Sequence, residues 1–119
     1  MSAKTWQQNM LGITFRYVDG RITVFRSALD SIGRPEFYHF LYNPTKQMFA
    51  IQACGMDAEG ANRVPKKNQD DRYEIKSKNL VRLIYQSCGW DRTRSYRLPG
   101  VEYPQQRLVN YDLCRAIPI

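Results

Sequence analysis

The chain has 119 residues, of which 43% are hydrophobic, and carries a formal net charge of +7 at pH 7. This length allows one compact domain with a hydrophobic core but leaves too little for two independent domains. No stretch approaches the roughly 18 uninterrupted apolar residues of a membrane span, and the first residues lack the apolar run of a secretory signal. We therefore expect a cytoplasmic protein without a membrane partner.

The positive charge is concentrated in the second half of the chain. Residues 1–59 contain 6 Lys or Arg against 5 acidic residues, whereas residues 60–119 contain 12 against 6. Such a surplus favours polyanions, chiefly nucleic acid, because each neutralised phosphate releases condensed counterions. The alternative is a basic surface without a ligand that keeps the protein in solution.

The first predicted elements are the two strands of a β-hairpin. Residues 1–9 are polar around Trp6 and predict a loosely held lead-in. Apolar and polar side chains then alternate over residues 13–17 and again over 21–25, as half-buried strands require. Asp19-Gly20 lies between them and suits the positive φ angles of a two-residue hairpin turn.

A short helix and a two-stranded ribbon follow this hairpin. Ser27 is the predicted N-cap, Gly33 is suited to close the helix in a left-handed conformation, and Pro35 prevents its continuation. The helix should therefore have barely two turns. The almost wholly apolar residues 37–42 predict a strand covered on both sides, and residues 47–53 return after a tight turn. We expect this ribbon at the centre of the core.

A similar order of elements returns after a polar segment. Residues 55–71 have few large apolar side chains and predict a loop. A strand at 72–75 precedes a longer helix over 77–88, which Ser77 should cap and Gly89 should end. Apolar residues at spacings of three and four predict the buried face of this helix: Leu80, Leu83, Ile84 and Cys88.

The second ribbon is predicted from residues 95–98 and 107–113. A corner at Pro99-Gly100 and a further proline at position 104 interrupt it. Prolines at these positions indicate a sheet edge or a bend, because proline cannot donate to a central ladder.

The two segments, about 10–54 and 72–115, share an order of elements rather than residue identities. Each contains a strand, a helix that begins near a serine and ends at a glycine, and a ribbon. Two similar halves predict a pseudo-symmetric dimer folded from one chain. The expected fold is a single α+β domain over 1–119, rich in β-structure.

The first segment resembles a known family. Asp19-Gly20-Arg21-Ile22-Thr23-Val24, the short helix that ends at Gly33 and the ribbon behind it resemble the AbrB-like (SpoVT/AbrB) swapped-hairpin family of bacterial DNA-binding regulators. The resemblance covers residues 13–53, and residues 72–113 by element order only. It implies a pseudo-dimeric swapped-hairpin barrel with two short helices, made from two tandem copies, and DNA as the partner.

The chain also departs from the family pattern. Phe25 stands where the family usually has a proline directly after the strand, and Leu29-Asp30 stand where family members often have basic residues. Arg21 is the one motif arginine that carries over by position. The resemblance therefore implies a basic contact surface that lies largely on the second copy.

Seven basic residues are candidates for nucleic-acid contact: Arg21, Lys76, Lys78, Arg82, Arg92, Arg94 and Arg97. The last three lie near aromatic residues at positions 90, 96 and 103, and this combination suits phosphates together with bases or sugars. The alternative is an exposed loop whose arginines pair with Asp91 and Glu102 while the aromatic side chains fill the core.

The other candidates have structural alternatives as well. The basic residues at the start and on the outer face of the second helix are placed to follow a DNA backbone, but a solvated polar face explains them equally well. Arg21 is also placed to brace the hairpin against Asp19.

Little in the sequence points to an enzyme or a cofactor. His39 is the only histidine and lies in an aromatic-rich strand, where a hydrogen-bonded structural imidazole is favoured over a catalytic base. Nucleophile elbows, phosphate-binding glycine loops and metal-ligand spacings are absent from the sequence. Asp70-Asp71 should point to opposite faces of an extended segment and so not converge on a cation. The three cysteines predict small core residues rather than disulfides or metal ligands: Cys54, Cys88 and Cys114.

The leading prediction is a small non-catalytic bacterial DNA-binding protein, either a transcriptional regulator or a mobile-element accessory factor. Binding would be mainly electrostatic, through Arg21 and the basic residues of the second copy. The competing prediction is a protein-interaction module or homodimer of the same fold without DNA contact. The apolar, aromatic first half and Leu29-Asp30 favour this second interpretation.

Overall fold

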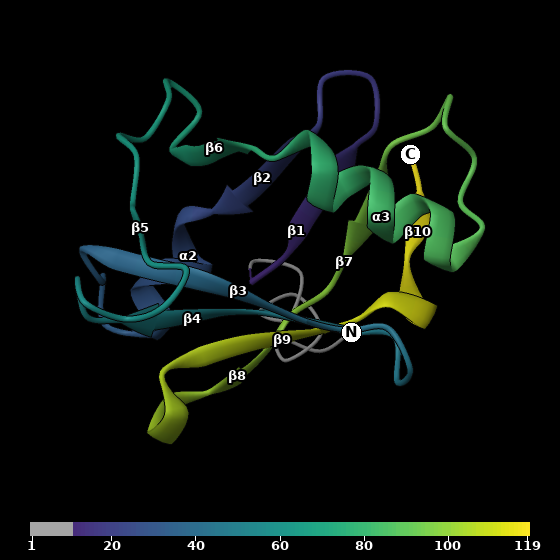
Figure 1. The fold of residues 1–119 in the computed structure, drawn as a ribbon. Coiled ribbons are helices and arrows are strands. Elements are labelled where there is room, and N and C mark those ends of the chain that lie inside the picture. The colour runs from purple at the N-terminus through teal and green to yellow at the C-terminus, as the bar shows by residue number, and fades with distance from the viewer. Residues whose placement is uncertain (1–10) are drawn as a thin grey trace, which may run out of the picture.

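Two antiparallel five-stranded sheets organise the chain (Figure 1). The computed structural model describes residues 11–119, so the lead-in predicted at residues 1–9 lies outside the described range. Sheet A has the strand order β10 (Ile117–Pro118), β7 (Tyr96–Leu98), β1 (Ile13–Arg16), β2 (Arg21–Phe25) and β6 (Arg72–Lys76). Sheet B has the order β5 (Asn62–Arg63), β3 (Phe37–Asn43), β4 (Met48–Cys54), β9 (Leu108–Asp112) and β8 (Val101–Tyr103).

Short helices connect these strands. The α-helices are α2 (Arg26–Ser31) and α3 (Lys78–Cys88), and two 3-10 turns, η1 (Pro104–Gln106) and η2 (Leu113–Arg115), flank β9. The prediction of an α+β, β-rich fold is confirmed. Both sheets are open within residues 11–119, each with two edge strands.

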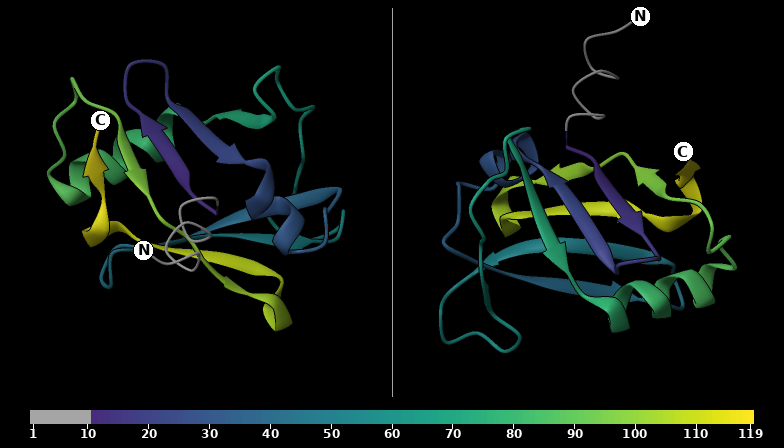
Figure 2. Two further views of the ribbon diagram at one scale, coloured as in Figure 1. Left: turned by 180° about the vertical axis from the view of Figure 1, so that it is seen from behind. Right: turned by 90° about the horizontal axis from the view of Figure 1, so that it is seen from above.

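The first hairpin forms as predicted, but with a longer turn. Strands β1 and β2 pair in register up to Arg16 opposite Arg21, so four residues rather than two connect them. The amide of Gly20 donates to the carbonyl oxygen of Tyr17 at 3.2 Å, and Gly20 has a φ of +65°. A Cβ at Gly20 would lie 2.6 Å from the Cα of Lys78. The turn thus packs directly on the first turn of α3, which passes the end of sheet A (Figure 2).

The helix ends follow the sequence pattern only in part. Helix α2 begins at Arg26, one residue before the predicted cap, so the N-cap assigned to Ser27 is wrong. Ser77 does hold the N-cap position of α3, but its side chain makes no capping hydrogen bond. Gly89 ends α3 with a φ of +67°, which confirms its predicted role.

The buried face of α3 agrees with the predicted one at Ile84, and the predicted Leu80 and Cys88 are half-buried and pack against the core. Val81, Ile84 and Tyr85 are buried, whereas Leu83 is 51% exposed, so its assignment to the core was wrong. The buried face of α3 is rotated relative to the predicted one because Tyr85 points into the core. Its hydroxyl donates a hydrogen bond to the backbone carbonyl oxygen of Phe15 in β1. A large aromatic side chain with an inward hydrogen bond outweighs one leucine in setting the helix orientation.

Strands β3 and β4 form the predicted ribbon, and they lie inside sheet B. Strand β3 also pairs with β5, so the predicted loop 55–71 contains a short strand. The ribbon packs on the core through one face only, because Leu41 on the other face is 41% exposed. The expectation of a strand covered on both sides was therefore wrong.

The second ribbon is shifted along the chain relative to the prediction. Strand β7 pairs with β1 in sheet A and not with the segment 107–113. The ribbon instead consists of β8 and β9, which pair from Val101 opposite Asn110 to Tyr103 opposite Leu108. Gly100 lies where the chain passes from β7 in sheet A to β8 in sheet B, and a Cβ there would lie 2.6 Å from the Leu11 carbonyl oxygen. The Pro99-Gly100 corner thus carries the chain from one sheet to the other.

The core lies between the two sheets. Phe15 of β1 contacts Phe49 of β4 edge to face, with ring centroids 5.3 Å apart. All three cysteines have free thiols. Cys88 is half-buried and packs against the core, Cys54 is half-buried and Cys114 is exposed, so the prediction of a core residue fits Cys88 and is wrong for Cys114. Over residues 11–119, neither helix has the length and apolar character needed to span a bilayer.

Candidate nucleic-acid interface

The outward face of sheet A carries every basic side chain of that sheet. Its strands alternate between buried residues, such as Ile22 and Val24, and residues that face away from the core. We call the outward cations the basic face: Arg16, Arg21, Arg72, Lys76 and Arg97. Glu74 is the only acidic residue in the five strands. The sheet therefore presents five cations against one acid.

Three of these cations form a row across adjacent strands. Arg21 of β2 lies opposite Arg16 of β1 on one side and opposite Lys76 of β6 on the other. Like charges directly opposite each other destabilise a sheet unless an anion compensates them. Asp19 in the turn supplies part of this compensation, at 2.9 Å from Arg21 and 3.8 Å from Arg16. Lys76 forms no ion pair within residues 11–119.

Arg21 has a structural role on this face. Its Nε donates to Asp19 at 3.1 Å, and its guanidinium lies 3.5 Å from the carboxylate of Glu74. The predicted brace between Arg21 and Asp19 is thus present. With two carboxylates beside it, this arginine contributes the least free charge of the five.

An aromatic ring lies between two arginines on the same face. The guanidinium of Arg72 lies 4.8 Å from the ring centre of Phe25, and that of Arg97 lies 5.8 Å from it. Neither arginine is ion-paired within the part of the chain that the structure describes. Cation–π contact holds such guanidiniums over the ring and leaves N–H groups free to donate outward.

The seven predicted contact residues do not form one surface. Arg21, Lys76 and Arg97 belong to the basic face. Arg82 and Arg92 instead line a separate depression beside Tyr17. Lys78 lies in the first turn of α3, against Gly20.

The loop between α3 and β7 carries the last candidate, Arg94, whose side chain is exposed. The carboxylate of Asp91 accepts hydrogen bonds from the amide and hydroxyl of Thr93, at 2.9 and 2.7 Å, which lower the pKa of this carboxyl. Within residues 11–119, neither Asp91 nor Glu102 forms an ion pair with the nearby arginines. The alternative of a charge-paired loop is therefore not what the structure shows.

Sequence reasoning missed two members of the basic face, Arg16 and Arg72. Each of them alternates with inward-facing residues of its strand, so a strict period of two marks both as outward. Their convergence depends on the pairing of β2 with β6, which joins residues about 50 positions apart. No local pattern in the sequence specifies that pairing.

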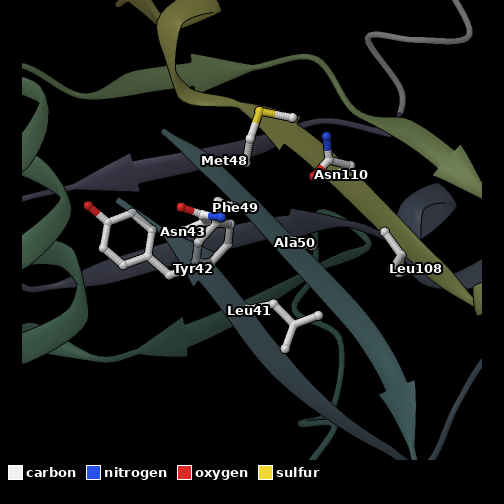
Figure 3. A pocket seen from close by; sticks show the side chains of 8 residues that line it. All are labelled: Leu41, Tyr42, Asn43, Met48, Phe49, Ala50, Leu108 and Asn110. Carbon is white, nitrogen blue, oxygen red and sulfur yellow. The ribbon is translucent and has the colours of Figure 1, made fainter. Parts of the chain in front are cut away.

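The outward face of sheet B lacks basic side chains on four of its five strands. Strands β3, β4, β8 and β9 contain neither Lys nor Arg. Their outward side chains line a groove of about 310 Å³, in which Leu41, Ala50, Leu108 and Asn110 come from three adjacent strands (Figure 3). Asp112 of β9 is the acidic residue of this outward surface, which we call the cation-free face.

The residues considered for catalysis or metal binding have structural partners. The Nε2 of His39 lies 2.8 Å from the Gln52 side-chain oxygen, and its Nδ1 lies 3.3 Å from the Glu59 carbonyl oxygen. Asp71 pairs with Lys67 at 2.9 Å, and this contact lowers the pKa of its carboxyl. Residues 11–119 contain no group of three His, Cys, Asp or Glu placed to hold a metal ion.

No protein-family model, curated protein or solved structure matches this chain. The distribution of charge between the two sheets is therefore the observation from which a function can be argued.

Proposed function

We propose that this protein is a non-catalytic DNA-binding protein and that the basic face of sheet A is its contact surface. The observation that carries the proposal is the segregation of charge. The strands of sheet A hold five cations and one acid, whereas β3, β4, β8 and β9 of sheet B hold no cation.

Binding would be mainly electrostatic. Arg72, Lys76 and Arg97 have no carboxylate partner within the described residues, so phosphates would meet them without displacing an internal ion pair. Such contacts position a protein on a polyanion but carry little sequence information. Phe25 holds the guanidiniums of Arg72 and Arg97 beside one ring, which leaves their N–H groups to meet phosphate oxygens.

We also propose that the two segments of the chain are copies related by a pseudo-twofold axis, as in a swapped-hairpin dimer. Two strand pairings support this. The strand that precedes each helix pairs with its counterpart, β2 with β6, and the two ribbons pair through their second strands, β4 with β9. Both pairings are antiparallel, as a twofold axis between equivalent strands requires.

The test is a gel-shift titration with duplex DNA at two salt concentrations. The unmodified protein should show a steep fall of affinity with salt, by about 0.9 in the logarithmic slope for each phosphate neutralised. The variant Arg72→Gln/Lys76→Gln/Arg97→Gln should bind more weakly, and its slope should fall by about 2 to 3.

A matched control removes the same charge elsewhere. Arg34→Gln/Lys46→Gln/Arg63→Gln also takes away three cations, but these lie outside sheet A, after α2, in the β3–β4 turn and in β5. It should keep the salt slope of the unmodified protein. If both triple variants weaken binding equally, net charge rather than the basic face is responsible, and the proposal is wrong.

A second candidate function rests on the cation-free face. Leu41, Val101 and Tyr103 are 41%, 44% and 45% exposed, and all three lie on outward positions of sheet B. A second copy of the chain is the partner that this face suits, because two molecules of charge +7 repel each other least where neither carries cations.

Sedimentation analysis separates this candidate from the first. A dimer that Leu41→Lys/Tyr103→Lys converts to a monomer, in a protein that does not bind DNA at low salt, supports the interaction module. A monomer at all concentrations excludes self-association through this face.

A further inference from the structure

A polar depression at the end of sheet A is distinct from both outward faces. Its volume is about 520 Å³, and it lies between the β1–β2 turn, helix α3 and the loop after it. Its walls are two arginines, three aromatic residues and two small or polar ones: Arg82, Arg92, Tyr17, Tyr85, Trp90, Gln86 and Gly89. None of the basic-face residues lines it, so its role is independent of the proposed DNA contact.

The two arginines converge on one aromatic side chain. The guanidinium of Arg82 lies 5.9 Å from the ring centre of Tyr17, and that of Arg92 lies 5.6 Å from the same centre. They come from different elements, Arg82 from the outer face of α3 and Arg92 from the loop that follows. Neither forms an ion pair within residues 11–119. Two like charges are thus held beside one ring without an ion-pair partner from the described residues.

The acid next to Arg92 in the chain has a partner of its own. Asp91 is adjacent to Arg92 in sequence, but its carboxylate accepts both the amide and the hydroxyl of Thr93. These hydrogen bonds keep the carboxylate within its own turn. The positive charge of the depression therefore remains available to a ligand.

The loop that carries Arg92 is fixed at both ends. The amide of Asp91 donates to the Tyr96 hydroxyl at 2.9 Å, and the Tyr85 hydroxyl lies 2.7 Å from the Arg94 carbonyl oxygen. Trp90 stacks on Tyr96 with ring centroids 4.5 Å apart and meets Tyr85 edge to face at 5.2 Å. A loop held in this way presents its arginine at low entropic cost on binding.

We propose that this depression is a binding site for a phosphate monoester attached to a nucleoside. Two guanidiniums that have no ion-pair partner among residues 11–119 match a dianion, because each presents a planar fork of N–H donors to phosphate oxygens. The half-buried ring of Trp90 lines the same depression and gives the base an aromatic surface beside the guanidiniums. The volume lies within the range of small-molecule sites. A free nucleotide and the phosphorylated end of a nucleic-acid strand share this chemistry.

Tryptophan fluorescence provides the test, because Trp90 lines the site. The chain has two tryptophans, so Trp6→Phe leaves Trp90 as the only one, and excitation near the red edge of tryptophan absorption reports it apart from the tyrosines. Titration of this variant with adenosine 5′-monophosphate should change the emission saturably, whereas adenosine should not. In the same background, Arg82→Gln and Arg92→Gln should each weaken binding by about 10-fold or more, as the loss of a charge-assisted hydrogen bond predicts.

The matched control is Arg63→Gln. Arg63 also lies over an aromatic ring, 4.8 Å from the centre of Phe37, but it belongs to sheet B. It should leave nucleotide binding unchanged. Equal binding of adenosine and its monophosphate, or binding unaffected by both arginine substitutions, would overturn the assignment.

A last comparison identifies the source of the phosphate. A short single-stranded oligonucleotide with a 5′-phosphate that binds more tightly than its 5′-hydroxyl form and than the mononucleotide supports a strand end. Equal affinities of the phosphorylated strand and the mononucleotide support a free nucleotide. The triple variant of the basic face should retain mononucleotide binding in either case, so failure of the proposed DNA contact would not be mistaken for failure of this site.

Discussion

The hydroxyl of Tyr111, on β9 of sheet B, donates a 2.8 Å hydrogen bond to the carbonyl oxygen of Leu11, just before β1 of sheet A. Tyr111 itself is completely buried. This contact joins the start of one sheet to the last long strand of the other, across 100 residues of sequence. It is one of the interactions that set how the two sheets lie on each other.

Replacing Tyr111 with Phe tests this connection. The substitution keeps the ring but leaves the Leu11 carbonyl oxygen without its side-chain donor, so the free energy of unfolding should fall by about 1 to 3 kcal/mol. Urea denaturation measures this fall. The control is Tyr103→Phe, whose hydroxyl makes no hydrogen bond within the described residues and whose side chain is 45% exposed. Equal midpoints for the two variants would contradict the role assigned to Tyr111.

Two glycines with the same backbone conformation should respond differently to alanine. Gly20 and Gly89 have φ angles of +65° and +67°. At Gly89 a Cβ meets nothing within 4 Å, so Gly89→Ala should cost about 1 kcal/mol from backbone strain alone. At Gly20 the Cβ would lie 2.6 Å from the Lys78 Cα.

Gly20→Ala should therefore cost clearly more than Gly89→Ala, because α3 must move away from the turn as well. Thermal unfolding of both variants measures the difference. Similar melting temperatures would show that the β1–β2 turn does not pack on α3 as described.

Adjacent residues of α3 offer a direct check of its orientation. Ile84 is fully buried, and Ile84→Ala should lower the free energy of unfolding by about 2 to 5 kcal/mol through lost burial and a cavity. Leu83 is 51% exposed, and Leu83→Ala should change it by about 0.5 kcal/mol or less. Helical spacing places both residues on the buried face, so denaturant unfolding of the two variants tests whether Leu83 lies outside it. A loss at Leu83 similar to that at Ile84 would favour the predicted face.

The buried tyrosines should make the fold sensitive to alkali. Burial raises the pKa of Tyr85 to about 12 and also raises that of Tyr111, from an ordinary value of 10.0. Above pH 10 the unfolded chain releases these phenolic protons more readily than the folded protein does. Stability is therefore unaffected by these groups below pH 10 and falls as the pH rises towards 12.

Ultraviolet absorbance of tyrosinate, followed together with circular dichroism, measures this effect. Ionisation of the buried tyrosines should coincide with unfolding, and Tyr85→Phe should make the loss of stability with pH less steep. Complete tyrosine ionisation at pH 11 in a protein that keeps its circular dichroism would refute the prediction.

Local patterns in the sequence determined the elements with short-range causes. The alternation over residues 13–17 and 21–25 specifies the first hairpin, and a left-handed glycine at position 89 ends the second helix. The overall β-rich character and the surplus of positive charge also follow from composition and period alone. These features depend on residues within a few positions of one another, so the sequence suffices to predict them.

Tertiary structure decided everything that depends on distant pairing. The sequence of segment 96–98 does not specify its sheet, and its pairing with β1 and β10 places it in sheet A. Arg72 and Arg97 reach one ring, Phe25, because three separate strand pairings bring them together. The depression between Arg82 and Arg92 likewise requires that the β1–β2 turn pack on α3. The free energy of packing between the sheets depends on contacts across the whole core, so short sequence patterns do not predict which strands pair.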